Sequence, residues 1–174
     1  ISNAHPLSGE WRARAASSHR LAAYLGQHKA KLMLELGCGN GWLANIIASA
    51  AESSVVGLDR AGVELCQARR VFAHRQELSW IAADIFCGPF AARSFDVIVI
   101  ASAIQYFPDV PRLIQALAPM LRDRGEIHIL DSPLYAEQQV PAARERSRRY
   151  YEQLGFPEMA AHYYHHSPTA FAAY

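Results

Sequence analysis

Apolar and polar positions along the 174-residue chain form two kinds of segment. Short apolar runs that end in a polar or acidic residue are typical of parallel strands buried on both faces of a sheet. Longer segments with apolar residues three and four positions apart predict amphipathic helices. We expect strands at 32–36, 54–59, 78–84, 95–101 and 125–131, and helices at 7–25, 42–51, 62–72, 110–121 and 141–154. This alternation predicts an α/β domain with a doubly wound, mostly parallel sheet.

The last part of the chain has a different pattern. Residues 159–166 and 169–174 are rich in tyrosine and are separated by Ser167 and Pro168. Such a pattern predicts two short strands joined by a turn. We therefore expect a C-terminal antiparallel hairpin.

Composition limits the classes of function. The formal net charge of +1 gives no basic surface of the kind that nucleic acid requires, so we expect a small-molecule partner and no nucleic acid. No apolar run approaches the ~20 residues of a membrane span. The three cysteines are an odd number without C-x-x-C spacing, which argues against disulfides and a zinc site. We expect a cytoplasmic protein without a metal, and the oligomeric state is not predicted.

One stretch, K-L-M-L-E-L-G-C-G-N-G-W-L-A-N at 31–45, carries the strongest binding signal. Gly37, Gly39 and Gly41 stand at alternate positions between a predicted strand and a predicted helix. Glycine permits a positive φ and close approach of a ligand to backbone N–H groups, which are unpaired at a helix start. A plain strand-to-helix connection needs one such residue, so we expect a binding loop.

The spacing of these glycines narrows the choice of ligand. A dinucleotide fingerprint needs a third glycine at position 42, which is Trp42. A phosphate-binding P-loop needs Lys followed by Ser or Thr, which is absent. Glu35, two residues before the first glycine, would repel a pyrophosphate but suits a positively charged ligand. These residues count against a nucleotide-dependent oxidoreductase.

The stretch resembles motif I of the class I S-adenosylmethionine-dependent methyltransferases. The segments V-G-L-D at 56–59, A-D-I at 83–85, P-F at 89–90 and F-D-V-I-V at 95–99 are similar to the small-molecule branch that includes quinone-ring methyltransferases. The resemblance covers about residues 30 to 131. It implies a Rossmann-like sheet of seven strands with the last antiparallel, and S-adenosyl-L-methionine as the cofactor.

The resemblance also implies a set of cofactor-binding residues: Glu35, Gly37, Cys38, Gly39, Gly41, Asp59, Arg60, Asp84, Ile85 and Ala101. Asp59 follows Glu35 at an offset close to the ~20 residues at which a βαβ unit presents an acid to a ribose. In the family, Asp84 accepts from the adenine amino group and Ile85 contacts the ring. Either acid can instead cap the next helix. A ribose acceptor predicts that Asp59→Ala loses affinity, and a cap predicts that it loses stability.

Methyl transfer from a sulfonium is an in-line displacement, so it depends mainly on positioning and on exclusion of water. A general base helps a hydroxyl or amine acceptor, and Tyr106, Asp131 and Tyr135 are candidates, with Gln105 beside the first. The Asn/Asp-Pro-Pro-aromatic motif of the family's nucleic-acid enzymes is replaced by A-S-A-I at 101–104. Methylation of nucleic-acid bases is therefore disfavoured, and the acceptor atom stays open among oxygen, nitrogen and carbon.

We predict an N-terminal helix or lid at 1–30 and a cofactor-binding domain at 31–174. In the family such a helix often covers the cofactor, and Trp11 would then face the cofactor or the substrate; a helix that only covers the sheet is the alternative. The predicted function is methyl transfer to a small-molecule acceptor. A non-catalytic cofactor-binding module of the same fold is the alternative function.

Overall fold

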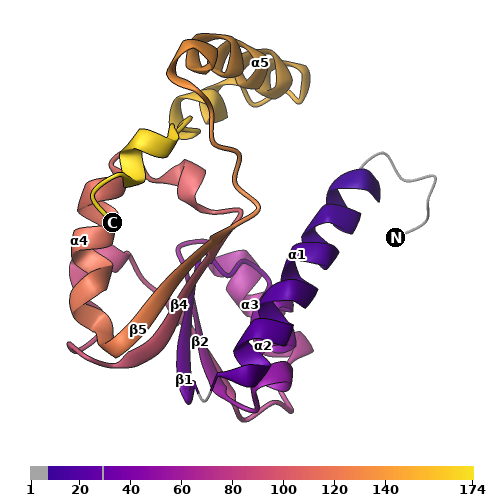
Figure 1. Cartoon of the computed structure of the whole chain (residues 1–174). Helices are drawn as coiled ribbons and strands as arrows, with labels where there is room; N and C mark the ends of the chain where they lie inside the picture. The colour runs from indigo at the N-terminus through magenta and orange to yellow at the C-terminus, as the bar shows by residue number, and fades with distance from the viewer. Residues whose placement is uncertain (1–7, 29) are drawn as a thin grey trace.

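A five-stranded parallel sheet forms the centre of the computed structural model, which describes residues 8–28 and 30–174 (Figure 1). The strands are β1 Leu32–Leu36, β2 Ser54–Asp59, β3 Leu78–Ala82, β4 Phe95–Ala101 and β5 Leu121–Leu130, in the order β3-β2-β1-β4-β5. Every pairing is parallel. The predicted α/β, Rossmann-like class is confirmed. The strand order reverses between β1 and β4, and open sheets of this kind bind ligands beyond the carboxyl ends at that point.

Helices cover both faces of the sheet. They are α1 Ser8–Gln27, α2 Trp42–Ala51, α3 Gly62–Val71, α4 Val110–Leu117 and α5 Val140–Gln153. On one face of the sheet, Leu25 of α1 and Ile47 of α2 are fully buried. On the other face, Leu113 and Leu117 of α4 are fully buried. This double cover explains why β1 and β4 are almost continuously apolar.

Several boundaries agree residue for residue with the predictions: β1, β2, β4 and α2. The predicted helix at 110–121 ends earlier, at Leu117, and continues as a 3₁₀ turn over Ala118–Met120 that contains Pro119. Proline lacks the N–H that a continuing α-helix would use, which accounts for the change.

The predicted C-terminal hairpin is wrong. Its segments contain 3₁₀ helices at Pro157–His162 and Pro168–Phe171, and His166 forms an isolated parallel bridge with Leu134. Each 3₁₀ helix has a proline in its first turn, where the fixed φ favours a helical start and the missing N–H cannot join a ladder. The described residues therefore form five strands rather than seven.

The helix α1 is divided between a packed half and a projecting half. Its buried residues all lie from Ser17 onward, and its N-terminal half extends away from the sheet (Figure 1). Residues 1–7 and Lys29, which belong to the predicted lid segment, lie outside the described part of the chain. None of the described helices has the length and apolar character needed to cross a membrane.

Candidate functional site

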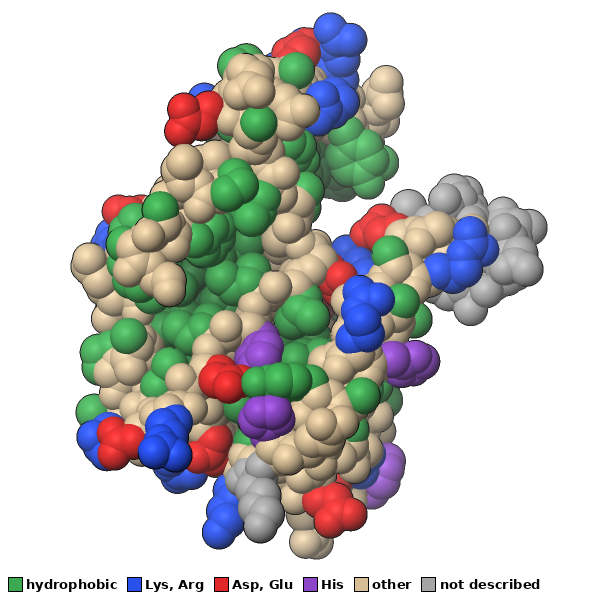
Figure 2. Space-filling model, viewed as in Figure 1, with side chains coloured by type: hydrophobic (Ala, Val, Ile, Leu, Met, Phe, Trp, Pro, Cys, Tyr) green, Lys and Arg blue, Asp and Glu red, His purple; other side chains and the backbone are tan. Residues whose placement is uncertain are grey.

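A cavity of about 900 Å³ lies at the carboxyl ends of the strands. In Figure 2 the surface is open between α5 at the top and the projecting part of α1 at the right. Ligand sites usually measure about 300–1,000 Å³, so this cavity has room for two small molecules side by side. Of the predicted cofactor residues, all but Gly41 line it: Glu35, Gly37, Cys38, Gly39, Asp59, Arg60, Asp84, Ile85 and Ala101.

The glycine loop has the predicted backbone. Gly37, Gly39 and Gly41 have φ of 75°, 50° and 77°. The N–H groups of Gly37 and Cys38 donate to the carbonyl of Leu58 at 2.8 and 3.2 Å, so the loop is held against the end of β2. A Cβ on Gly37 would come within 2.5 Å of the Cβ of Ala103, which leaves no space for a side chain.

Gly41 has a packing role that the sequence did not reveal. It is the N-cap of α2, and a Cβ there would lie 2.2 Å from the Trp80 ring. The same ring would lie 2.6 Å from a Cβ on Gly57 of β2. Trp80 thus packs directly on two glycine backbones beneath the loop.

Glu35 is a buried carboxylate beside the cavity. Its side chain is only 3% exposed, and its Oε2 atom has no hydrogen-bond partner. Burial raises the pKa of Glu35 to about 8, an N–H donated by Ala44 opposes this, and the charge of Asp59 adds to it. A buried carboxylate with a free oxygen suits a cationic ligand, because a nearby positive charge stabilises the ionised form. The buried Glu35 carboxylate therefore fits a cofactor that carries positive charge, as a sulfonium does.

The acid that ends β2 and the acid that follows β3 both accept backbone N–H groups. Asp59 accepts from Gly39 at Oδ2 and from Ala61 at Oδ1, each at 2.8 Å. Asp84 accepts from Phe86 at 3.0 Å at the start of the 3₁₀ helix Ile85–Cys87. A carboxylate has about four acceptor positions, so these contacts leave room for ligand hydroxyl or amino groups. Asp84 is therefore a helix cap that can still bind a ligand, whereas Asp59 holds the turn before α3 without capping that helix.

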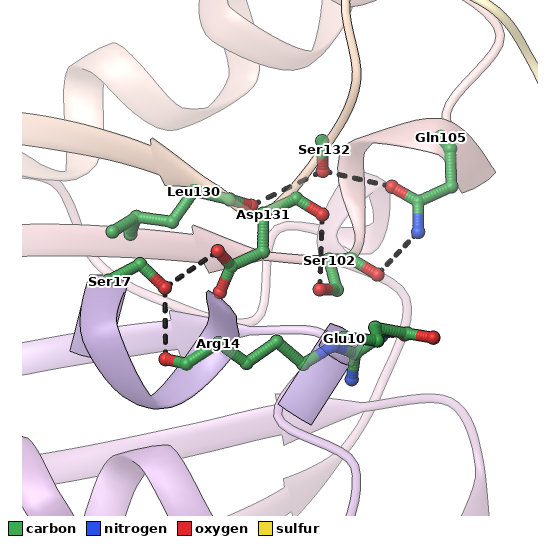
Figure 3. A network of polar contacts seen from close by, with 8 residues as sticks. All are labelled: Glu10, Arg14, Ser17, Ser102, Gln105, Leu130, Asp131 and Ser132. Atoms are coloured by element: carbon green, nitrogen blue, oxygen red, sulfur yellow. Dashed lines mark hydrogen bonds and ion pairs between the residues drawn. The ribbon is translucent and has the colours of Figure 1, made fainter. Parts of the chain in front are cut away.

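Polar side chains from distant segments meet at the other end of the cavity, after β4 and β5 (Figure 3). The Ser17 hydroxyl of α1 lies 2.6 Å from Asp131 Oδ1 and donates to it, although the two residues are 114 positions apart. The Ser102 hydroxyl donates to the Asp131 carbonyl at 3.2 Å. Ser102 and Asp131 have φ of 51° and 54°, which is strained for residues other than glycine and is typical of functional sites.

Two of the three predicted catalytic candidates line the cavity, and the third does not. Asp131 and Tyr106 line the cavity, and the Tyr106 side chain is 49% exposed. Tyr135 is not among the lining residues and packs against His165, with ring centroids 5.4 Å apart. The buried Gln105 amide donates to the Ser102 carbonyl at 2.6 Å and accepts from Ser132 at 3.0 Å, so both of its ends are engaged.

The projecting part of α1 contributes two cavity residues. The ring of Trp11 meets that of Trp42 edge to face at 5.9 Å. Arg14 stacks over Trp11 at 5.4 Å and forms an ion pair with Glu10 at 2.6 Å. Sequence reasoning named Trp11 but missed Arg14, whose spacing of three residues from Trp11 on one helix was the available signal.

Comparisons with known proteins agree with this geometry. Residues 33–125 match the family model described as methyltransferase domain. The chain is 30% identical over 132 residues to the 2-phytyl-1,4-naphtoquinone methyltransferase of Thermosynechococcus vestitus, covering 75% of this chain and 57% of that one. It is 32% identical over 126 residues to the demethylmenaquinone methyltransferase of Thermus thermophilus, covering 71% and 54%.

Among solved structures, the YcgJ protein of Bacillus subtilis has a TM-score of 0.72 at 20% identity, covering 91% of this chain and 65% of that one. This likeness shows the fold. The chain spans little more than half the length of the two curated relatives named above.

Proposed function

The chain belongs to the class I, S-adenosylmethionine-dependent methyltransferases, and from this premise we propose that it transfers a methyl group from S-adenosylmethionine to a small-molecule acceptor. The observation that carries the proposal is the single cavity that joins two unlike ends. The glycine loop and Glu35 stand at one end, and Asp131 stands at the other. The first end suits a cationic donor and the second suits an acceptor that must lose a proton.

The residues at the glycine-loop end would hold the donor. Asp59 accepts from the ribose, Asp84 and Ile85 bind the adenine, and the loop backbone takes the methionine part, with Cys38, Arg60 and Ala101 completing the wall. Arg14 of α1 also lines the cavity, on the side where Ser17 meets Asp131 (Figure 3), and there it can pair with an anionic group of a ligand in place of Glu10. Exchange of this partner is inexpensive because the Arg14–Glu10 pair is partly exposed.

The sulfonium supplies an activated methyl group when the donor is bound. The protein positions the acceptor in line with that methyl and excludes water. A bond forms between acceptor and methyl carbon, the bond from that carbon to sulfur breaks, and the acceptor's proton passes to Asp131. Ser17 occupies Oδ1 of this carboxylate, which leaves Oδ2 for the proton. Tyr106 lies on the acceptor wall, and the projecting part of α1 acts as a lid.

The acceptor is a small molecule rather than a nucleic acid. This is supported by the A-S-A-I sequence after β4 and by the nearly neutral net charge. The two relatives are named for quinone-ring acceptors, and we infer a ring acceptor of similar size for this chain. The cytoplasmic location stays a prediction.

Transfer of a labelled methyl group tests the proposal. The purified protein is incubated with S-adenosylmethionine labelled in its methyl group and with three acceptor sets: reduced naphthoquinones, phenols and amines. We expect label in one set, and loss of a general base in Asp131→Asn should lower turnover by about 10²-fold or more. Tyr135→Phe is the matched control outside the cavity and should keep its rate. Donor binding without transfer to any set would identify a non-catalytic binding module, and preferential binding of NAD would overturn the cofactor assignment.

A further inference from the structure

Arg14 is the positive charge on the acceptor side of the cavity. Among the described residues that line the cavity, only Arg14 and Arg60 are cationic. The Arg60 side chain is 82% exposed and lies 3.7 Å from Asp84, at the donor end. Arg14 instead lies one turn before Ser17 on α1, and its carbonyl is 2.9 Å from the hydroxyl that also reaches Asp131 (Figure 3). A ligand at the acceptor end therefore meets one guanidinium there.

The C-terminal segment lies across the opening from the projecting part of α1 (Figure 1). Its Tyr163 meets Tyr106 edge to face, with ring centroids 6.1 Å apart, and Tyr106 lines the cavity together with Met159. Burial raises the pKa of Tyr163, and the charges of Glu10 and Arg14 reach the same phenol. The electrostatic contact places Arg14 on the side of the aromatic wall that follows β4.

The present partner of Arg14 is easily exchanged. One guanidinium nitrogen lies 2.6 Å from Glu10 Oε1, but the two side chains are 29% and 51% exposed. Ion pairs between exposed side chains four residues apart stabilise a helix only weakly. The guanidinium also lies over the Trp11 ring, 5.4 Å from its centroid, which holds its plane in one orientation. A ligand carboxylate can therefore take the place of Glu10, and Glu10 then returns to water.

We propose that the methyl acceptor is an aromatic carboxylate and that Arg14 selects it by binding its acid group. A guanidinium binds a carboxylate through two parallel hydrogen bonds, which gives direction as well as affinity. The cavity offers Trp11 and Tyr106 to the ring of such a compound. The inference rests on the proposed function, because it takes Asp131 as the point at which the acceptor reacts.

The spacing of residues along α1 determines where the acid group stands. Ser17, which contacts Asp131, lies three residues after Arg14 and seven after Glu10. At about 1.5 Å of rise per residue, a guanidinium between the levels of Arg14 and Glu10 stands about 5–10 Å from the level of Asp131. Two fused rings have a comparable length. The acid group is therefore expected at the far end of the ring system from the reacting atom and not beside it.

Calorimetric titration of the protein saturated with S-adenosylhomocysteine tests the inference without methyl transfer. Three ligands are compared: 2-naphthol, 6-hydroxy-2-naphthoate, whose acid is on the far ring, and 3-hydroxy-2-naphthoate, whose acid is beside the hydroxyl. We expect the far-ring acid to bind about ten-fold more tightly than the other two, as one charged hydrogen-bonded pair provides. Arg14→Met should remove this preference. Arg14→Lys should keep part of it, because lysine keeps the charge and loses the fork.

Two further variants separate ligand selection from a structural role of the ion pair. Glu10→Gln removes the competing carboxylate, so the far-ring acid should bind a few-fold more tightly, whereas loss of a merely structural pair would not improve binding. Arg20→Met is the matched control, because Arg20 is an exposed arginine of the same helix that does not line the cavity. It should keep the full preference. The affinity for S-adenosylhomocysteine should be unchanged in Arg14→Met.

Equal binding of 2-naphthol and the far-ring acid to the unmodified protein, or a preference that survives in Arg14→Met, would overturn the inference. So would a loss of S-adenosylhomocysteine affinity in Arg14→Met, which would assign Arg14 to the donor. If Arg14→Met does not fold, the three ligands on the unmodified protein and on Glu10→Gln decide. Methyl transfer to neutral phenols without selection for the acid keeps the proposed function and overturns the inference. Selection for the acid without transfer does the reverse.

Discussion

The two ends of the cavity are built in different ways. At the glycine-loop end, backbone groups at the ends of the adjacent strands β1 and β2 hold one another, as when Gly37 and Cys38 donate to Leu58. The acceptor end is held instead by side chains from segments that are far apart in sequence, as when Ser17 donates to Asp131. The donor is common to a whole family and the acceptor is particular to each member. An end that is held by backbone groups therefore suits the methyl donor, which does not vary. The acceptor end is built from side chains, so substitutions can change it without disturbing the donor site.

The C-terminal segment belongs to the acceptor end. The N–H of Tyr164 donates to the Gln105 carbonyl at 2.7 Å, and His166 Nε2 lies 3.2 Å from the Ile104 carbonyl. These contacts fix the 3₁₀ helix Ile104–Tyr106 and with it the position of Tyr106. Residues between the two C-terminal 3₁₀ helices thus help to shape a wall of the cavity.

The largest expected effect is at Gly41, the glycine of the loop that packs on Trp80. Gly41→Ala should lower the free energy of unfolding by about 3 kcal/mol or more, since it combines a left-handed φ with a clash against Trp80. Gly88→Ala is the control, because Gly88 has a φ of 62° and nothing within 4 Å. That variant should lose about 1 kcal/mol. Urea unfolding measures both, and equal losses would show that Trp80 yields to the new methyl group.

Asp59→Ala should act on both stability and binding. The carboxylate ties the glycine loop to the end of β2 and holds the turn before α3 through the N–H of Ala61, so we expect a loss of about 2 kcal/mol in the free energy of unfolding. If Asp59 also accepts from the ribose, S-adenosylmethionine affinity should fall by about ten-fold or more. Calorimetry and urea unfolding give the two values. Unchanged affinity in a destabilised variant would leave Asp59 with a structural role alone.

The smallest effect should come from two neighbouring serines of α1. Ser17 and Ser18 are both buried and both hydroxyls lie within hydrogen-bond distance of a carbonyl three residues earlier, but only the Ser17 hydroxyl, which has one hydrogen for two acceptors, also reaches Asp131. Ser17→Ala should therefore destabilise the protein by about 1 kcal/mol more than Ser18→Ala, the net value of an ordinary hydrogen bond, because the Ser17 hydrogen is shared between Asp131 and the Arg14 carbonyl. Once an acceptor is found, Ser17→Ala should also turn over more slowly. Identical behaviour of the two variants would mean that α1 does not organise the acceptor end.

The same division explains what could be predicted from the sequence. The strands, α2 and the positive φ of Gly37 follow from local patterns, because apolar runs and glycine spacing act over a few residues. The contact of Ser17 with Asp131 could not be predicted, because no pattern links positions so far apart. Gly41 was assigned to the cofactor because its spacing fits the loop, and only the placement of Trp80 shows its packing role. The hairpin was predicted from tyrosine content, which the prolines at the helix starts override.

The thiol of Cys38 gives the site a chemical property of its own. It lines a cavity that, as proposed, holds an alkylating agent, and a thiolate there would itself be a good nucleophile. Burial raises the pKa of the Cys38 thiol well above its usual range, with the charges of Glu35 and Asp59 adding to the effect. The sulfur therefore stays protonated near neutral pH. Burial, with the nearby carboxylates, thus keeps the one cysteine of the glycine loop in its poorly nucleophilic form.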